Sequence, residues 1–166
     1  MFRKLIGALG FAALLAGSSS LNAQVWSVPA TAGAIESASL LNYYASQTSL
    51  AFQATATGTV GAIYGVTTPM DSSTNPAWTT MEFTARNPGG SPATFAQAIL
   101  YRIPKNSASG GGSVCIAQAP ATGAVSTTTC FLSSAIDFNN YRYYVRVLLS
   151  RDSTASIVAA YEIRIH

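Results

Sequence analysis

YRYYVRVLLSRDSTASIVAAYEIRI, the stretch from Tyr141 to Ile165, contains two runs in which apolar and polar side chains alternate. The first run extends from Tyr141 to Leu149 and the second from Ile157 to Ile165. A period of two indicates β-strands, because successive side chains leave opposite faces of a strand. Many of the residues are β-branched or aromatic, which suits a half-buried sheet, and the polar segment 151–156 is turn-forming. The stretch therefore predicts a β-hairpin.

The register of this hairpin follows from burial, because a slip of one residue would turn an apolar face toward water. A turn centred near Thr154 keeps the odd-numbered faces together. The cross-strand pairs predicted from it are Val145 with Ile163, Val147 with Tyr161, and Arg146 with Glu162. The charged pair is expected on the outer face, where it contributes roughly 0.2–1 kcal/mol and helps to fix the register.

Residues 1–23 are predicted to be a signal peptide rather than part of the fold. Arg3 and Lys4 precede an apolar run from Leu5 to Gly17, and Ala23 provides a small residue for cleavage. The apolar run is too short for a permanent membrane span, which needs about 20 residues. We therefore expect an exported protein that is secreted, periplasmic or on the cell surface, and that meets a membrane only through the signal peptide during export. Residues 24–166 are predicted to form one β-sandwich domain.

The charge of the chain argues against nucleic acid as a partner. Nine Lys and Arg residues stand against six Asp and Glu residues in the full sequence. Loss of the signal peptide removes Arg3 and Lys4 and leaves seven basic residues against six acidic ones. Nothing remains that resembles the basic patch of a nucleic-acid-binding domain.

The two cysteines, Cys115 and Cys130, are expected to form a disulfide bond. In an exported chain a pair of cysteines is most simply oxidised. Two cysteines and the single histidine, His166, do not supply the four ligands of a structural zinc site. We therefore expect no metal and no cofactor.

Strand-like runs recur through the rest of the chain, with turn signals between them. Thr79–Arg86 and Ala93–Ile103 are predicted to form one hairpin, and Val114–Gln118 and Val125–Leu132 another, closed by the disulfide near its open end. The run Ala93–Ile103 is apolar on both faces, which predicts a central place in its sheet. No long amphipathic helix appears, so the fold class is all-β: a single antiparallel β-sandwich of the jelly-roll type.

Side chains suited to catalysis are scarce. His166 is the last residue of the sequence, where a frayed, solvated end is expected rather than a base or a metal ligand. The acidic residues include no pair that is distinguished by its setting, so no catalytic residue is assigned and no enzymatic activity is expected. Asp71, with nearby Ser and Asn oxygens, leaves a weak option for calcium. The acidic residues considered are Glu36, Asp71, Glu82, Asp137, Asp152 and Glu162.

Aromatic residues give the remaining functional signal. Tyr144 is predicted to lie on the outward face of its strand beside Arg142 and Arg146, and such an exposed patch suits an interface. A sugar-stacking surface is a second interpretation of the aromatic residues, and packing in the core is the preferred one. The aromatic residues considered for stacking are Trp78, Tyr101, Tyr141 and Tyr144. The residues proposed for an interaction surface are Trp78, Arg142, Tyr144 and Arg146.

Two segments carry a resemblance to known proteins. Ile136-Asp137-Phe138-Asn139-Asn140, which leads into the tyrosine-rich run 141–149, and Val25-Trp26-Ser27-Val28-Pro29 resemble parts of small uncharacterised exported bacterial β-sandwich proteins. The resemblance implies the same fold. It implies no catalytic residue and no substrate.

The sequence therefore favours an exported, non-enzymatic β-sandwich with a structural, surface or adhesive role. In one version the protein assembles with itself into oligomers or fibres, and residues 24–34 are donated as a strand to a neighbouring copy. The alternative is a carbohydrate-binding module with a glycan as its partner. An eight-stranded outer-membrane β-barrel is a third and less favoured interpretation.

Overall fold

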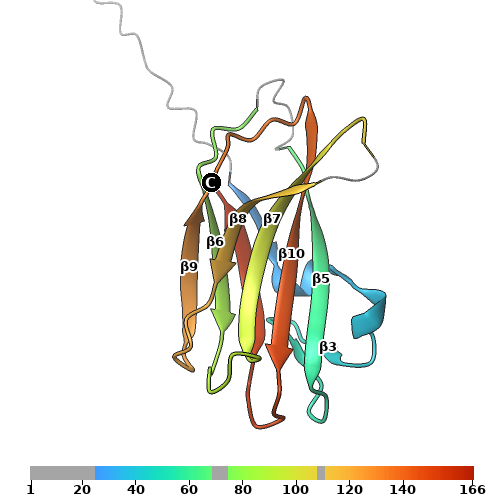
Figure 1. Ribbon diagram of the computed structural model, residues 1–166, viewed down its shortest axis with the longest axis vertical. Coiled ribbons are helices and arrows are strands. Elements are labelled where there is room, and N and C mark those ends of the chain that lie inside the picture. Colours follow the sequence, from blue (N-terminus) through green and yellow to red (C-terminus); the bar gives the residue numbers. More distant parts are fainter. Residues whose placement is uncertain (1–24, 69–74, 108–110) are drawn as a thin grey trace, which may run out of the picture.

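The computed structural model describes residues 25–68, 75–107 and 111–166, which form two antiparallel sheets packed against each other (Figure 1). The first sheet, sheet A, has the strand order β3-β4-β11-β6-β9, and β1 also pairs with β11. The second, sheet B, has the order β2-β5-β10-β7-β8. The predicted all-β, jelly-roll-like sandwich is thus confirmed, whereas the predicted signal peptide lies outside the described residues.

The bounds of the strands are β1 Trp26–Pro29, β2 Ala34–Ile35, β3 Tyr43–Ala45, β4 Leu50–Phe52, β5 Gly58–Val66, β6 Thr80–Arg86, β7 Phe95–Pro104, β8 Gly112–Gln118, β9 Val125–Phe131, β10 Tyr141–Arg151 and β11 Ala159–Ile165. Two short 3-10 turns, Ala30–Ala32 and Ser37–Ser39, lie between the first strands.

The three predicted hairpins are wrong, because in each case the chain crosses from one sheet to the other. β6 and β7, β8 and β9, and β10 and β11 are successive strands, yet one member of each pair belongs to sheet A and the other to sheet B. The alternation along a strand shows that one face is buried, and the facing sheet covers that face. It does not show whether the next strand in the chain lies beside it in the same sheet or opposite it in the other sheet. β7 does lie inside its sheet, between β10 and β8, as its two apolar faces predict.

The register predicted for the last two strands is corrected in the same way. Val145 pairs with Tyr64 on β5 and Leu100 on β7, whereas Ile163 belongs to sheet A and pairs with Val28 and Phe83. The predicted charged pair of Arg146 with Glu162 is also absent. Arg146 binds Glu36, and Glu162 accepts a hydrogen bond from the Ser27 hydroxyl at 2.8 Å.

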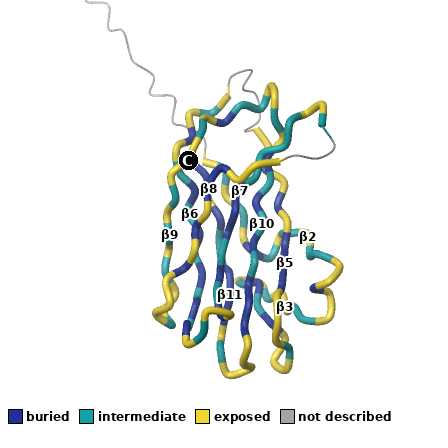
Figure 2. The backbone as a smooth tube through the Cα atoms, viewed as in Figure 1, coloured by how far each residue is buried: buried dark blue, intermediate teal, exposed yellow. Residues whose placement is uncertain are grey.

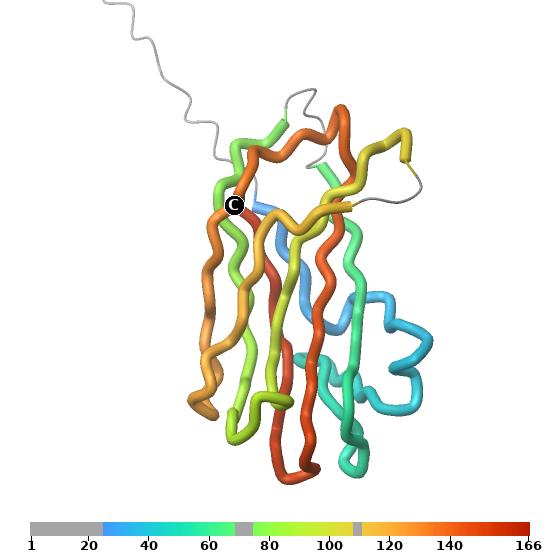
Figure 3. The backbone as a smooth tube through the Cα atoms, viewed as in Figure 1, coloured from blue at the N-terminus to red at the C-terminus, as the bar shows by residue number. Residues whose placement is uncertain are grey.

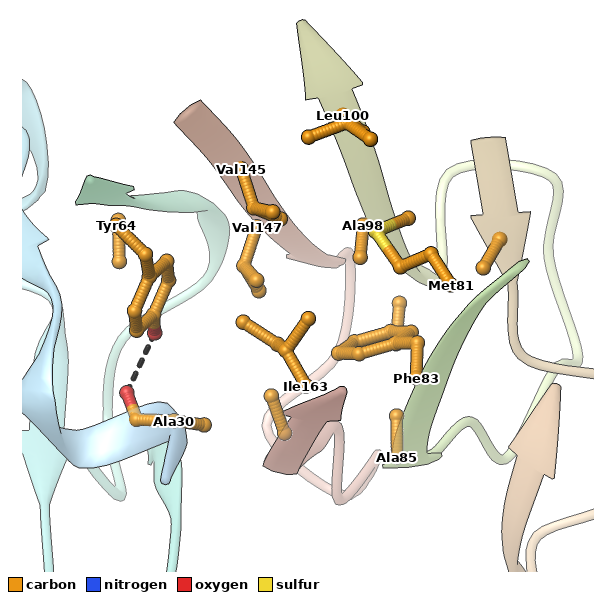
Figure 4. Packing of buried hydrophobic residues seen from close by; sticks show 14 of the residues in the cluster. Ala30, Tyr64, Met81, Phe83, Ala85, Ala98, Leu100, Val145, Val147 and Ile163 are labelled. Carbon is orange, nitrogen blue, oxygen red and sulfur yellow. Dashed lines mark hydrogen bonds between the residues drawn. The ribbon is translucent and has the colours of Figure 1, made fainter. Parts of the chain in front are cut away.

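The core lies between the two sheets, and buried residues alternate with more exposed ones along the long strands (Figure 2). Phe83, Met81 and Ile163 of sheet A face valines and leucines of sheet B (Figure 4). The Tyr64 ring closes one side, and its hydroxyl donates to the Ala30 carbonyl oxygen at 2.5 Å. Burial raises the pKa of this hydroxyl well above its ordinary value.

The N-terminal described segment is part of this sandwich. β1 runs beside β11, so that the blue and red ends of the chain lie together (Figure 3), and Trp26 and Val28 pack against the core. The segment that strand exchange would donate to a neighbouring copy therefore pairs within its own chain.

The disulfide between Cys115 and Cys130 is confirmed, and it joins the two sheets rather than the two arms of one hairpin. Cys115 is on β8 of sheet B and Cys130 is on β9 of sheet A. The bond closes a loop with a sequence separation of 15 residues. On the chain-entropy model such a loop is worth about 3 kcal/mol.

We therefore expect the double substitution Cys115→Ala and Cys130→Ala to lower the free energy of unfolding by about 3 kcal/mol, because the unfolded chain gains freedom. Urea denaturation of the variant and of the wild type measures this difference. The reduced wild type is the control and should unfold near the midpoint of the variant. An unchanged midpoint in the variant would show that the loop is already constrained by other contacts.

Candidate functional site

The outward faces of the two sheets differ in chemistry. Sheet A presents mainly threonine and charged side chains, with single exposed apolar residues at the two ends of β9, Val125 and Phe131. Sheet B presents aliphatic, aromatic and arginine side chains instead, and two of its isoleucines, Ile63 and Ile116, are 40% and 51% exposed. The residues on the outward face of sheet A include Thr80, Glu82, Thr84, Thr127, Thr129, Glu162 and Arg164. Those on the outward face of sheet B include Ile63, Ile99, Tyr101, Ile116, Arg142, Tyr144 and Arg146.

The centre of the sheet B face is a pair of stacked tyrosine rings. Tyr144 on β10 is directly opposite Tyr101 on β7. Their ring centroids are 5.0 Å apart and the ring planes differ by 14°. Two rings that lay side by side in one plane could not have centroids this close. The rings are therefore stacked with an offset, and each ring has a second face that is turned away from its partner.

Small residues flank the pair on both sides. On β5 the residue opposite Tyr144 is Gly65, and on β8 the residue opposite Tyr101 is Ser113. A Cβ atom added to Gly65 would meet nothing within 4 Å, and the same is true of Gly112, beside Ser113. The free face of the Tyr144 ring therefore borders an open space above β5. Tyr101, Tyr144 and Gly65 together form a surface, the tyrosine platform.

Arg146 follows Tyr144 by two residues on the same face of β10, and it is held in place by an acidic partner. Its Nε and Nη2 atoms donate to the two carboxylate oxygens of Glu36, at 2.5 and 2.9 Å. This bidentate pairing lowers the pKa of Glu36 and raises that of Arg146, chiefly through the hydrogen bonds. The Glu36 carboxylate occupies the space that a side chain at position 61 would fill, because a Cβ on Gly61 would clash with it. Arg146 is therefore a fixed, neutralised edge of the platform.

Arg142 precedes Tyr144 by two residues on the same face of β10, and it is exposed. Its Nη2 atom donates to the carbonyl oxygen of Ser107 at 3.2 Å. No ion pair involves Arg142 among the described residues. It thus carries a positive charge that faces solvent.

The structure brings together some of the predicted site residues and separates others. Arg142, Tyr144 and Arg146 share one face, and Tyr101 joins Tyr144 there. The placement of Trp78 on an interaction surface is wrong, because its side chain is 2% exposed and its ring meets Phe138 edge-on at a centroid distance of 6.1 Å.

Trp78 follows the turn-rich segment that precedes β6, and it faces into the sandwich end instead of outward. Tyr141 lies apart from the platform as well, against Tyr143 and beneath the guanidinium of Arg102.

Each described acidic side chain has a structural partner. Glu82 approaches Arg164 at 3.7 Å and His166 at 3.4 Å, and Asp152 accepts a hydrogen bond from Thr94 at 2.9 Å. Asp137 accepts hydrogen bonds from Asn75, Asn139 and Asn140, and these bonds lower its pKa. The carboxyl group of Asp137 thus stays ionised and holds its own turn. Asp71, the weak calcium candidate, lies outside the described residues.

His166 is not the frayed end that the sequence predicts. Its backbone N–H donates to the Thr80 carbonyl at 3.0 Å, and its carbonyl accepts from the N–H groups of Thr79 and Thr80. The imidazole ring lies 3.4 Å from Glu82. In the part of the chain that the structure describes, no three His, Cys, Asp or Glu side chains gather as a metal site would require, and no helix is long and apolar enough to cross a membrane.

Comparison with known proteins finds similar folds among solved structures but no related sequence. No protein family and no characterised protein sequence matches the chain. Among solved structures, a xylan-binding module of family CBM15 is similar with a TM-score of 0.52 and 19% identity, over 87% of this chain and 96% of that one. A family 11 carbohydrate-binding module from Clostridium thermocellum, solved in complex with a β-1,3-1,4-mixed-linked tetrasaccharide, has a TM-score of 0.43 and 14% identity, over 90% of this chain and 91% of that one. The first likeness shows a shared β-sandwich fold.

The sequence did not reveal the platform itself. The sequence identifies both Tyr101 and Tyr144 as candidates for stacking, but their pairing depends on β7 and β10 being neighbours although β8 and β9 lie between them in the chain. Glu36, which fixes Arg146, gave no signal in the sequence, and neither did the open space at Gly65.

Proposed function

We propose that this protein is a non-catalytic, exported carbohydrate-binding protein that holds a glycan on the outward face of sheet B. The observation that carries the proposal is the tyrosine platform: a rigid aromatic pair whose free ring face borders open space over a glycine. A sugar ring has an apolar face that packs on an aromatic ring, while its hydroxyl groups form hydrogen bonds with polar side chains nearby. Arg142 and Arg146 provide such donors on either side of Tyr144.

Two further features support the proposal. Sheet A also carries exposed aromatic residues, Tyr44 on β3 and Phe131 on β9, but among the described residues neither of them belongs to a stacked pair. The fold is also that of a module which binds xylan, although the likeness extends to the fold alone. The disulfide between the sheets suits a protein that works outside the cytoplasm.

Substitution of Tyr144 by alanine is expected to weaken glycan binding roughly tenfold or more, because the aromatic face is lost and the stacked partner ring is left unsupported. Affinity electrophoresis in native gels with arabinoxylan and with β-1,3-1,4-glucan, preceded by a glycan array, measures the effect. Tyr101→Ala should have a similar but smaller effect, because Tyr101 supports the ring of Tyr144.

The matched control is Tyr44→Ala. Tyr44 is also a strand tyrosine and is 58% exposed, but it lies on β3 of sheet A. Its loss should leave glycan binding unchanged. The proposal is wrong if no glycan on the array binds, or if Tyr44→Ala and Tyr144→Ala weaken binding equally.

A surface for self-association is the second candidate, because the exposed side chains of Ile63 and Ile116 lie on the same face of sheet B. Aliphatic side chains suit a protein partner better than a sugar. In this case the double substitution Ile63→Ser and Ile116→Ser would convert an oligomer to a monomer in size-exclusion chromatography with light scattering. A wild type that is monomeric at high concentration would remove this candidate.

A further inference from the structure

A pocket of 410 Å³ opens at the end of sheet B, next to the tyrosine platform. The ends of β5 and β10 form its sides, and Phe138 and Tyr141 give it aromatic walls. Two cationic side chains, Lys105 and Arg142, line it as well. Arg142 therefore belongs both to the pocket and to the outward face that carries Tyr144.

The two cations that line this pocket form no ion pair with a described residue. Lys105 and Arg142 are exposed and take part in no ion pair there. Arg102 adds a third positive charge nearby, with its guanidinium carbon 4.9 Å from the centroid of the Tyr141 ring. The acidic residue closest in the chain to the aromatic wall, Asp137, is ionised, but its oxygens accept hydrogen bonds from Asn75, Asn139 and Asn140 and form no ion pair with Lys105 or Arg142.

The only other carboxylate that approaches this face in the described chain is Glu36, and Arg146 neutralises it. An aromatic pocket lined by two cations that form no ion pair is complementary to an anionic group on a ligand.

The spacing connects the pocket with the platform. Arg142 and Tyr144 lie two residues apart on the same face of β10, which separates their Cα atoms by about 7 Å. A polysaccharide that stacks one sugar on Tyr144 can therefore present a neighbouring sugar to the pocket.

We propose that the glycan is acidic, and that Lys105 and Arg142 bind a carboxylate or sulfate group of one sugar while an adjacent sugar stacks on Tyr144. This inference rests on the proposed function and specifies the class of its ligand. No bond is formed or broken in the interaction.

Two pairs of polymers test the inference and separate the two sources of charge. Polygalacturonate is compared with its fully methyl-esterified form, and dextran sulfate is compared with dextran, by affinity electrophoresis in native gels at low and at moderate salt. We expect the acidic member of at least one pair to bind tenfold or more tightly than its neutral counterpart. Preference within the first pair identifies a carboxylate, and preference within the second identifies a sulfate.

Matched variants distinguish the pocket from general attraction between charges. Arg142→Gln and Lys105→Gln should each reduce the preference for the acidic polymer at least fivefold. Arg164→Gln removes the same charge from the exposed outer face of sheet A and should leave the preference unchanged. Equal effects of Arg142→Gln and Arg164→Gln, or equal binding of acidic and neutral polymers, would overturn the inference.

The outcome also separates this inference from the proposed function. If neutral and acidic polymers bind equally and Tyr144→Ala weakens both, the platform binds glycans and only the acidic class is wrong. If none of the four polymers binds and the glycan array is also empty, both proposals fail.

Discussion

Substitution of Trp78 by alanine is expected to lower the free energy of unfolding by about 3–5 kcal/mol. The indole ring is 2% exposed and packs against Phe138 at one end of the sandwich. Alanine would leave a large void there, and the neighbouring β6 is held in its sheet by β9 and β11, so it cannot move in to fill the space. Urea denaturation followed by circular dichroism measures the loss.

Phe131→Ala provides the control for this prediction. Phe131 is a large aromatic residue at the end of β9, but its side chain is 80% exposed. We expect a change within about 0.5 kcal/mol. If Trp78→Ala instead left stability unchanged and abolished glycan binding, Trp78 would be a ligand-binding residue after all.

Substitution of Arg151 by methionine is expected to cost about 3 kcal/mol or more. The Arg151 side chain is 5% exposed, and its guanidinium donates to five backbone carbonyl groups from two separate loops. It also lies over the ring of Phe52, with the guanidinium carbon 4.8 Å from the ring centroid. Methionine fills a similar space but leaves these carbonyls without a donor, so both loops lose their attachment. The carbonyl groups belong to Gln53, Ala54, Ala56, Thr154 and Ser156.

Two further variants define the cause of that effect. Arg151→Lys keeps the positive charge but cannot direct a planar fork of donors at several carbonyls, so most of the loss should remain. Arg164→Met removes an exposed arginine that lies 3.7 Å from Glu82, and it should change stability by less than about 1 kcal/mol. A lysine variant as stable as the wild type would show that charge alone is needed at position 151. Thermal and urea unfolding of the three variants give the comparison.

The sequence predicted which face is buried in β10 and β6, but not in β11, where a bulge between Ala160 and Glu162 shifts the alternation and leaves Tyr161 half-buried. In β10 the alternating residues Tyr143, Val145, Val147 and Leu149 are buried as predicted, and the alternation ends at Ser150 and Arg151, which are buried as well. In β6 the buried side chains are Met81, Phe83 and Ala85. This part of the fold is readable because burial is a property of single residues, and polar side chains cannot occupy the core without partners.

The neighbours of each strand could not be predicted in the same way. The segment 151–158 contains turn-forming residues, but those residues serve equally well in a tight hairpin and in an arch that spans the two sheets. The inner faces of β10 and β11 satisfy each other across the core, so the alternation is the same in both arrangements. The Arg146–Glu162 pair failed for this reason: opposite charges at matching positions are compatible with a hairpin without requiring one.

The candidate site was predicted in part. The outward placement of Arg142, Tyr144 and Arg146 followed from the alternation of β10 alone. Tyr101 stacks on Tyr144 only because β7 is the neighbour of β10, which depends on the whole topology. The prediction for Trp78 was wrong because this residue lies just before β6, where no alternation shows which way a side chain points.

The pairing of β1 with β11 has a consequence for how the chain acquires its structure. β1, the first described strand, cannot pair until β11, the last strand, has been synthesised. β6 also lacks its neighbour on one side until then. Few strands find a partner nearby in the sequence, so most pairings require the closure of long stretches of chain, which slows folding. A ribosome-bound chain that lacks its final segment would leave Phe83 and Met81 uncovered, and such a chain needs protection from aggregation until synthesis is complete.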